Sequence, residues 1–228
     1  ISLQQWEQAI EFLGKAVDAS EELGDYRSFQ KAINKLSDLY LQLGEFREAI
    51  KCHKKQLAAS QKIGDLETSG NLFNVIGLAL IHLGVMDEAI IYLEQGLSMS
   101  RKLQDKTLEG SCLINIAIHA RHVNEYAKVV DLYDRAIDCY RAANSKIGEA
   151  IVISELATLY LQKGKIELAI DNLNIAINIF QEFKYVPKYA YALGNLGNAY
   201  QVKGDIEKAI EYHKQALAIS QTILDHLN

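Results

Sequence analysis

Two histidines are the residues of this chain whose spacing comes closest to a metal site. His119 and His122 stand three residues apart in the stretch HARH, and on a helix this spacing places two side chains on one face. Zinc sites need three or four protein ligands, of which imidazole is one. No neighbouring motif supplies the other ligands, so we expect polar surface residues here rather than a metal centre.

Catalysis has no recognisable motif in this chain. The sequence contains no P-loop, no glycine-rich turn of the dinucleotide-binding kind, and no HExxH or GxSxG motif, which are the patterns that carry phosphate, metal and nucleophile chemistry. Four serines recur at one position of a repeat, which indicates close helix packing rather than nucleophiles: Ser20, Ser60, Ser100 and Ser220. We therefore predict a non-catalytic protein without a cofactor or a metal.

The cysteines and the apolar segments indicate a reducing compartment and no membrane insertion. Cys52, Cys112 and Cys139 are odd in number and lack CxxC or Cys/His spacing, so we expect buried free thiols. The first residues, ISLQQWEQAIEF, are amphipathic rather than a signal sequence. No apolar run approaches the about 20 residues that cross a bilayer. We predict a cytoplasmic protein.

The charges of the chain argue against nucleic acid as a partner. The net charge of -5 comes from 29 acidic and 24 basic residues, which are scattered without the basic stripe that a phosphate backbone requires. With 49% hydrophobic residues and one proline, the chain is also too apolar to be disordered.

The elements that must position any site repeat every 40 residues. Two columns of small residues mark the period, the glycines Gly44, Gly84, Gly164 and Gly204 and the alanines Ala9, Ala49, Ala89, Ala169 and Ala209. Each copy reads as two amphipathic helices that bury their apolar faces against their neighbours. We predict an all-α fold, an α-solenoid of antiparallel helix pairs with about 11 helices. Its single domain, 1–228, divides into the second helix of an incomplete repeat (1–25), five complete repeats (26–65, 66–105, 106–145, 146–185 and 186–225) and the start of a truncated continuation (226–228).

Helix ends are marked within each repeat. The shared glycine closes the first helix because it adopts the left-handed conformation without steric cost. Asp or Ser then precedes most of the first helices as an N-cap: Asp25, Asp65, Asp105, Ser145 and Asp225. Pro187 stands in the first turn of the last complete repeat, where its missing N–H costs nothing.

The repeated pattern "LGNLGNAY…KG…KAI…QAL" resembles the tetratricopeptide repeat (TPR) family over essentially the whole chain. Its 40-residue period is similar to the longer repeats of Leu-Gly-Asn repeat adaptors, kinesin light chains and bacterial peptide-sensing regulators, rather than to the usual period of about 34. The resemblance implies a right-handed superhelix whose first helices line a concave groove. In the third complete repeat Asn124 replaces the turn glycine, and Asn also tolerates the left-handed conformation.

A helical wheel places a second set of columns opposite the buried ones, on the groove side of the first helices. We predict that these side chains bind a protein or peptide partner: Lys31, Asn34, Asn71, Asn74, Leu78, Ile81, Ile114, Ile118, Arg121, Ile151 and Asn198. The apolar members form an exposed patch, unless curvature of the array buries them between adjacent first helices. The amides can donate to and accept from a peptide backbone.

Two functions fit this pattern. The leading hypothesis is a scaffold that binds a segment of another protein along the groove. The alternative is a regulatory peptide sensor attached to an effector domain outside this fragment, since the chain begins within a repeat and at Ile1 rather than Met. Homo-oligomerisation through the uncapped ends is left open.

Overall fold

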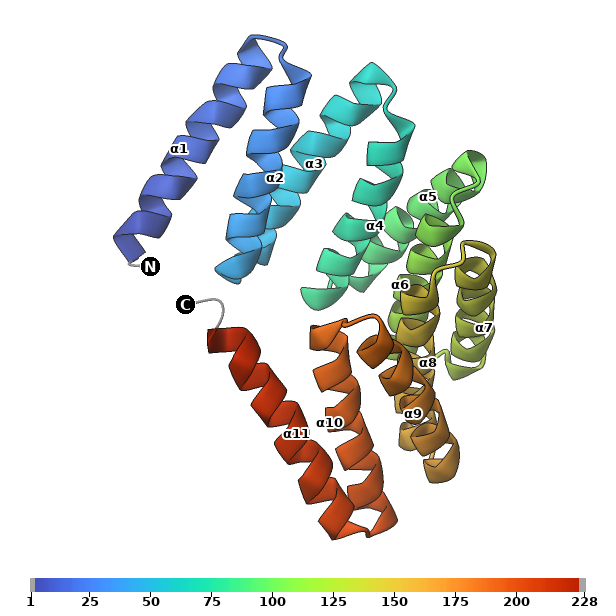
Figure 1. Cartoon of the computed structure of the whole chain (residues 1–228). Coiled ribbons are helices and arrows are strands. Elements are labelled where there is room, and N and C mark those ends of the chain that lie inside the picture. Colours follow the sequence, from blue (N-terminus) through green and yellow to red (C-terminus); the bar gives the residue numbers. More distant parts are fainter. Residues whose placement is uncertain (1–2, 226–228) are drawn as a thin grey trace. The chain divides into compact units, whose positions relative to one another are not determined.

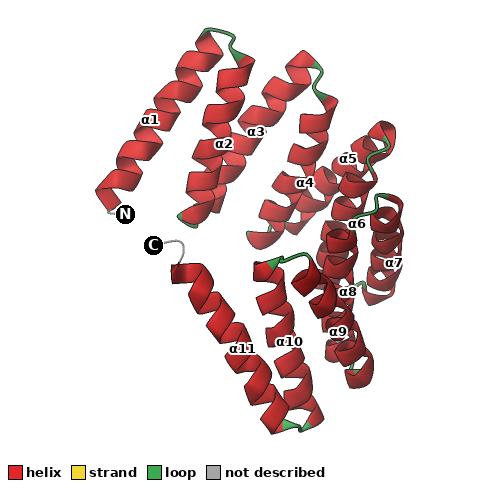
Figure 2. Cartoon of the chain, in the orientation of Figure 1, coloured by secondary structure: helices red, strands yellow, loops and turns green. Residues whose placement is uncertain are grey.

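The computed structural model describes residues 3–225 as helices joined by short turns, with no strand in that range (Figures 1 and 2). This confirms the all-α prediction. The helices of the described range are α1 (Leu3–Glu22), α2 (Tyr26–Gln42), α3 (Phe46–Ile63), α4 (Leu66–His82), α5 (Met86–Leu103), α6 (Lys106–His122), α7 (Tyr126–Ala142), α8 (Lys146–Gln162), α9 (Ile166–Glu182), α10 (Val186–Lys203) and α11 (Ile206–Asp225).

The chain divides into two compact units, Ile1–Asn124 and Glu125–Asn228. Inside the first unit, each helix from α1 to α6 packs on the next, and α4 also contacts α6. Inside the second unit, α7 to α11 pack in the same sequential way, and α8 also contacts α10. Each unit is thus built from consecutive helix pairs, as the solenoid prediction requires. The division of the chain into a single domain with five complete repeats stays a prediction.

The expected N-caps are present at four helices. The side chains of Asp25, Asp65, Asp105 and Ser145 each accept a hydrogen bond from the backbone N–H three residues later. Pro187 lies in the first turn of α10, as predicted. The prediction for Asp225 differs from the structure, because α11 continues through this residue instead of ending before it. The expected continuation at 226–228 lies outside the described residues.

The turn glycines adopt the predicted left-handed conformation. Gly44 and Gly84 both have a φ of 75° and Gly204 has 90°, so any L side chain at these positions would be strained. Asn124 takes the same conformation with a φ of 64°, which confirms the expectation for the exceptional repeat. Three further residues have positive φ that was not predicted: Gln104 at 57°, Asn144 at 53° and Lys184 at 54°.

Replacing Lys184 by glycine should stabilise the protein. A long side chain at a φ of 54° carries a steric cost of about 1 kcal/mol that glycine removes, although glycine also gains freedom in the unfolded chain. We expect Lys184→Gly to raise the free energy of unfolding by about 0.5 kcal/mol, measured by chemical denaturation. The matched control is Lys163→Gly, at a helix end with a φ of −91°, which should destabilise. Equal effects at both positions would contradict the argument.

Close contact between paired helices explains the columns of small residues. A Cβ atom added to Gly77 on α4 would lie 2.6 Å from the side chain of Leu93 and 3.2 Å from the carbonyl oxygen of Ala89, both on α5. Ala89 and Leu93 are fully buried. The backbones therefore approach as the pattern predicted, and the apolar side chains fill the remaining space at the density of a protein interior.

Two buried glutamates join successive pairs. Glu109 on α6 accepts hydrogen bonds from Arg101 Nε on α5, at 3.0 Å, and from Lys106 Nζ, at 2.7 Å. Forty residues later Glu149 on α8 accepts from Arg141 Nε on α7, at 2.8 Å, and from Lys146 Nζ, at 3.1 Å. Burial alone would raise the pKa of each carboxyl, but the hydrogen bonds and charges of the two cations together hold it below its usual range.

Candidate partner-binding surface

The first helices of the first unit, α2, α4 and α6, carry most of the residues predicted to bind a partner. We call the members that reach solvent the first-helix face: Lys31 and Asn34 on α2, Asn71, Asn74 and Leu78 on α4, and Ile118 and Arg121 on α6. The α2 residues and Asn71 are exposed, and the others are half-buried. The face is therefore charged and polar on α2, mixed on α4, and more apolar on α6.

Two of the predicted contact residues are buried instead of exposed. Ile81 is 4% exposed and Ile114 is 8% exposed, so the expectation of a contiguous exposed patch is wrong at these positions. Ile81 lies on α4 and Ile114 lies on α6, and these two helices contact each other. Both side chains are thus covered, although the helical wheel placed them on the side away from the partner helix of their own pair. Burial between adjacent first helices was the alternative expectation for this patch. They belong to the core of the first unit.

Asn34 is positioned by a polar chain that begins at the buried Gln56 on α3. The Gln56 amide nitrogen donates to Asn34 Oδ1 at 3.0 Å and also to Gln30 Oε1. Gln30 in turn donates to the hydroxyl of Tyr26, which donates to the N-cap carboxylate of Asp65 at 3.3 Å. Because the oxygen of the Asn34 amide is fixed by Gln56, its NH₂ group could donate to a ligand without a large loss of side-chain freedom.

Asn74 is held in a comparable way between two first helices. The Nδ2 of the buried Asn115 on α6 donates to Asn74 Oδ1 on α4 at 2.9 Å. This contact uses the acceptor of Asn74 and leaves its amide nitrogen as a donor, with no partner among the described residues. Asn71, one turn earlier on α4, instead donates to the backbone oxygen of Glu67 at 3.1 Å, so its amide partly serves its own helix.

Gln56 and Asn115, the two residues that orient these amides, were not predicted from the sequence. For Gln56 a signal existed, because the equivalent positions of the other repeats hold only alanine or glycine: Ala16, Gly96, Ala136, Ala176 and Ala216. A polar side chain in a column of small residues needs a buried partner. Asn115 stands in a column of mixed residues and gave no such signal.

Two predicted contact residues lie in the second unit. Ile151 on α8 is half-buried, and Asn198 on α10 is exposed. Within this unit α8 and α10 contact each other, which is the arrangement of first helices seen for α4 and α6. Their part in partner binding stays a prediction.

The histidines and cysteines that were considered for metal or redox chemistry lie in other environments. His119 is within 3.2 Å of the carbonyl oxygen of Met86, and His122 is exposed. Among the described residues no group of three His, Cys, Asp or Glu side chains could hold a metal ion. The three cysteines are buried free thiols, as predicted. Burial raises the pKa of Cys112 to about 12, so this thiol stays protonated and unreactive at neutral pH.

A family model described as Tetratricopeptide repeat matches residues 28–102, 68–142 and 148–222. These matches span more than half of the chain and reach into every helix from α2 to α11. The chain belongs to the tetratricopeptide repeat family. The resemblance inferred from the sequence is thereby confirmed, and the helix pairs described above are TPR helix pairs.

Solved structures with a similar fold come from proteins of different kinds. BtubC (BKLC) from P. vanneervenii is 19% identical with a TM-score of 0.77, over 96% of this chain and 92% of that chain. A Rap protein complexed with Competence and Sporulation Factor is 15% identical with a TM-score of 0.74, over 96% and 75%. A signal transduction ATPase of the STAND class with a TPR sensor, from Pyrococcus horikoshii, is 19% identical with a TM-score of 0.61, over 96% and 38%. Identities this low concern the fold.

A comparison with curated protein sequences finds no match. Within residues 3–225, no helix combines the length and the apolar character needed to cross a membrane.

Proposed function

We propose that this TPR chain is a non-catalytic scaffold that binds a peptide segment of a partner protein along the first-helix face. TPR arrays are interaction modules, and their first helices offer equivalent positions at regular spacing to an elongated ligand. The proposal assigns binding to Lys31, Asn34, Asn71, Asn74, Leu78, Ile118 and Arg121 of the first unit and, by extension, to Ile151 and Asn198 of the second.

The positioning of Asn34 and Asn74 is the observation that carries this proposal. The two amides occupy the same position of successive repeats, and each is held by a second amide, Gln56 or Asn115. Hydrogen bonds of this kind restrict each side chain before a ligand arrives, which reduces the entropy cost of binding. Half-buried Leu78 and Ile118 on the same face supply apolar contact next to them.

The experiment is a selection from a library of displayed random 12-residue peptides, followed by affinity measurement with variants. We expect selected peptides to lose about tenfold in affinity for Asn74→Ala, because one hydrogen bond to the peptide backbone is removed. Ile118→Ser should weaken binding to a similar degree by removing apolar contact. Serine is a milder replacement than an acidic residue. Ile118 is half-buried, so a carboxylate at this position would also destabilise the fold.

The control variant is Lys214→Glu, which alters an exposed charge on the second helix α11 and should leave the equilibrium affinity unchanged. Circular dichroism on every variant separates lost binding from lost folding. Selected peptides that bind wild-type protein and all face variants equally would place the binding site elsewhere and reject the proposal.

A regulatory sensor is the second candidate. It is favoured by the fold shared with part of a STAND ATPase that has a TPR sensor and with a Rap protein complexed with Competence and Sporulation Factor. A sensor has two conformations with different affinities for its ligand. Small-angle scattering with a selected peptide distinguishes the two: a scaffold keeps its radius of gyration on binding, whereas a sensor changes it.

A further inference from the structure

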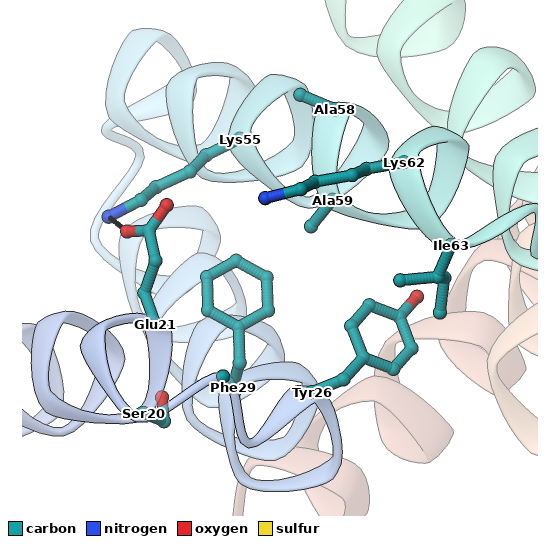
Figure 3. Close-up of a pocket in the computed structure, with 10 residues that line it drawn as sticks. Ser20, Glu21, Tyr26, Phe29, Lys55, Ala58, Ala59, Lys62 and Ile63 are labelled. Atoms are coloured by element: carbon teal, nitrogen blue, oxygen red, sulfur yellow. Dashed lines mark ion pairs between the residues drawn. The ribbon is translucent and has the colours of Figure 1, made fainter.

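A cleft of about 440 Å³ lies among α1, α2 and α3 of the first unit (Figure 3). The end of α1, the first turn of α2 and the last two turns of α3 enclose it. Figure 3 shows the rings of Phe29 and Tyr26 on one side, with Lys55 and Lys62 of α3 on the other. Its volume falls within the range of small-molecule sites, about 300 to 1,000 Å³.

A small residue lies beside the cleft, at a position where later repeats have Met, Cys or Ile. Ala59 lines the cleft and packs against the core cluster that contains Phe29. The equivalent position of the next pair holds Met99, whose side chain would be only 3.1 Å from a Cβ atom added to Gly70 on α4, so it fills the space between its helices. Ile179 and Ile219 occupy the same column in the last two repeats.

The walls of the cleft are mostly apolar, and its two lysines differ in whether they form an ion pair. Phe29 is 3% exposed and forms part of the floor. Lys55 Nζ is neutralised by Glu21, at 2.7 Å, and by Asp18, at 3.3 Å. Lys62 is exposed and forms no ion pair or hydrogen bond with any described residue. The cleft therefore offers an aromatic and aliphatic surface with one lysine at its edge, Lys62, that is not held in an ion pair.

We propose that this cleft binds a small amphipathic anion, with an aromatic or branched aliphatic body against Phe29 and Ala59 and a carboxylate on Lys62. The apolar body is removed from water on a preformed surface, and the carboxylate finds a cation that does not have to give up another partner. A peptide helix is about 10 Å wide, whereas the cleft accommodates one compact group. This proposal stands apart from the proposed function of the first-helix face: α2 contributes to both, but none of the residues lining the cleft belongs to that face.

The test is isothermal titration calorimetry of the whole chain with 3-phenylpropionate and with its neutral amide, 3-phenylpropanamide. Wild-type protein should bind the carboxylate about tenfold more tightly than the amide. Lys62→Gln should abolish this difference without changing the affinity for the amide. Ala59→Met, which introduces the residue found at position 99, should weaken both ligands at least about tenfold by filling the cleft.

Two matched variants control for effects outside the cleft. Lys102→Gln removes the lysine at the equivalent position of the next repeat, and Ala218→Met adds the same side chain at an exposed site on α11; both should leave binding unchanged. Lys62→Gln alters an exposed residue, so the test stands even if Ala59→Met unfolds. Absence of binding to wild-type protein, or binding that both cleft variants leave intact, would overturn the proposal. It would also be overturned if library-selected peptides, but not 3-phenylpropionate, lost affinity for Ala59→Met, since the cleft would then receive a partner's side chain.

Discussion

Gly148→Ala should destabilise the second unit by about 3 kcal/mol, although alanine is the better helix former. A Cβ atom at this position of α8 would lie 2.2, 2.5 and 2.7 Å from three ring atoms of Tyr140 on α7. Tyr140 is 5% exposed, so its ring cannot turn away into solvent. The clash must be relieved by moving α7 against α8, and the ion pairs of Glu149 with Arg141 join the same two helices.

The matched control for this substitution is Gly194→Ala on α10. A Cβ atom there meets nothing within 4 Å, so only the change in helix propensity remains, and we expect stabilisation of about 0.5 to 1 kcal/mol. The opposite signs at two helical glycines of the same unit separate packing from propensity. Chemical denaturation followed by circular dichroism measures both.

A compensating change should rescue the packing defect. At the equivalent positions one repeat earlier the chain has Ser100 and Leu108 in place of Tyr140 and Gly148, and both Ser100 and Leu108 are buried. We expect the double variant Tyr140→Ser with Gly148→Leu to be more stable than the sum of the two single changes by about 1 to 3 kcal/mol. Additive losses, or a neutral Gly148→Ala, would show that the two side chains do not share one space.

Features that depend on a single helix pair could be predicted from the sequence. The turn glycines, the N-caps and the small residues between paired helices follow from backbone conformation and from contacts within 40 residues. The left-handed conformation of Gln104 and Lys184 has no signal in their own side chains. Its signal lies in the repeat column that they share with Gly24, Gly64 and Asn144, residue types that tolerate a positive φ.

Contacts between successive pairs explain the errors at the predicted site. A helical wheel accounts for the partner of a helix within its own pair but not for the next first helix, and for that reason it placed the buried Ile81 and Ile114 on an exposed face. The exchange of volume between Tyr140 and Gly148 also crosses from one repeat to the next. The cleft beside Ala59 is a further case, since its existence depends on three helices at once.

The two buried glutamates should make the protein sensitive to acid. The pKa of Glu109 and of Glu149 is lowered in the folded protein, so the folded state releases their protons more readily than the unfolded chain does. Their contribution to the free energy of unfolding is fully present above the usual glutamate pKa of about 4.3. It is lost as the pH falls from there through the lower pKa of the folded state.

At neutral pH, Glu149→Gln should cost about 1 to 3 kcal/mol. The value is below the 3 to 5 kcal/mol typical of a fully buried broken pair, because the side chains of Arg141 and Lys146 are 60% and 61% exposed and regain water. Glu109→Gln should cost a similar amount, since the side chains of Arg101 and Lys106 are also half exposed. The two sites lie in different units, so their effects should be close to additive.

The pH dependence distinguishes this charge effect from a general loss of packing. Urea denaturation between about pH 7 and pH 3 should show a steeper loss of stability for wild-type protein than for Glu109→Gln with Glu149→Gln, so that the two curves converge at low pH. The control Glu94→Gln replaces an exposed carboxyl that forms no ion pair with any described residue and should follow the wild-type curve. If the free energy of unfolding of the double variant instead lies below that of wild-type protein by the same amount at every pH, the cost of the substitutions comes from side-chain packing. The two glutamates would then not be the cause of the acid sensitivity.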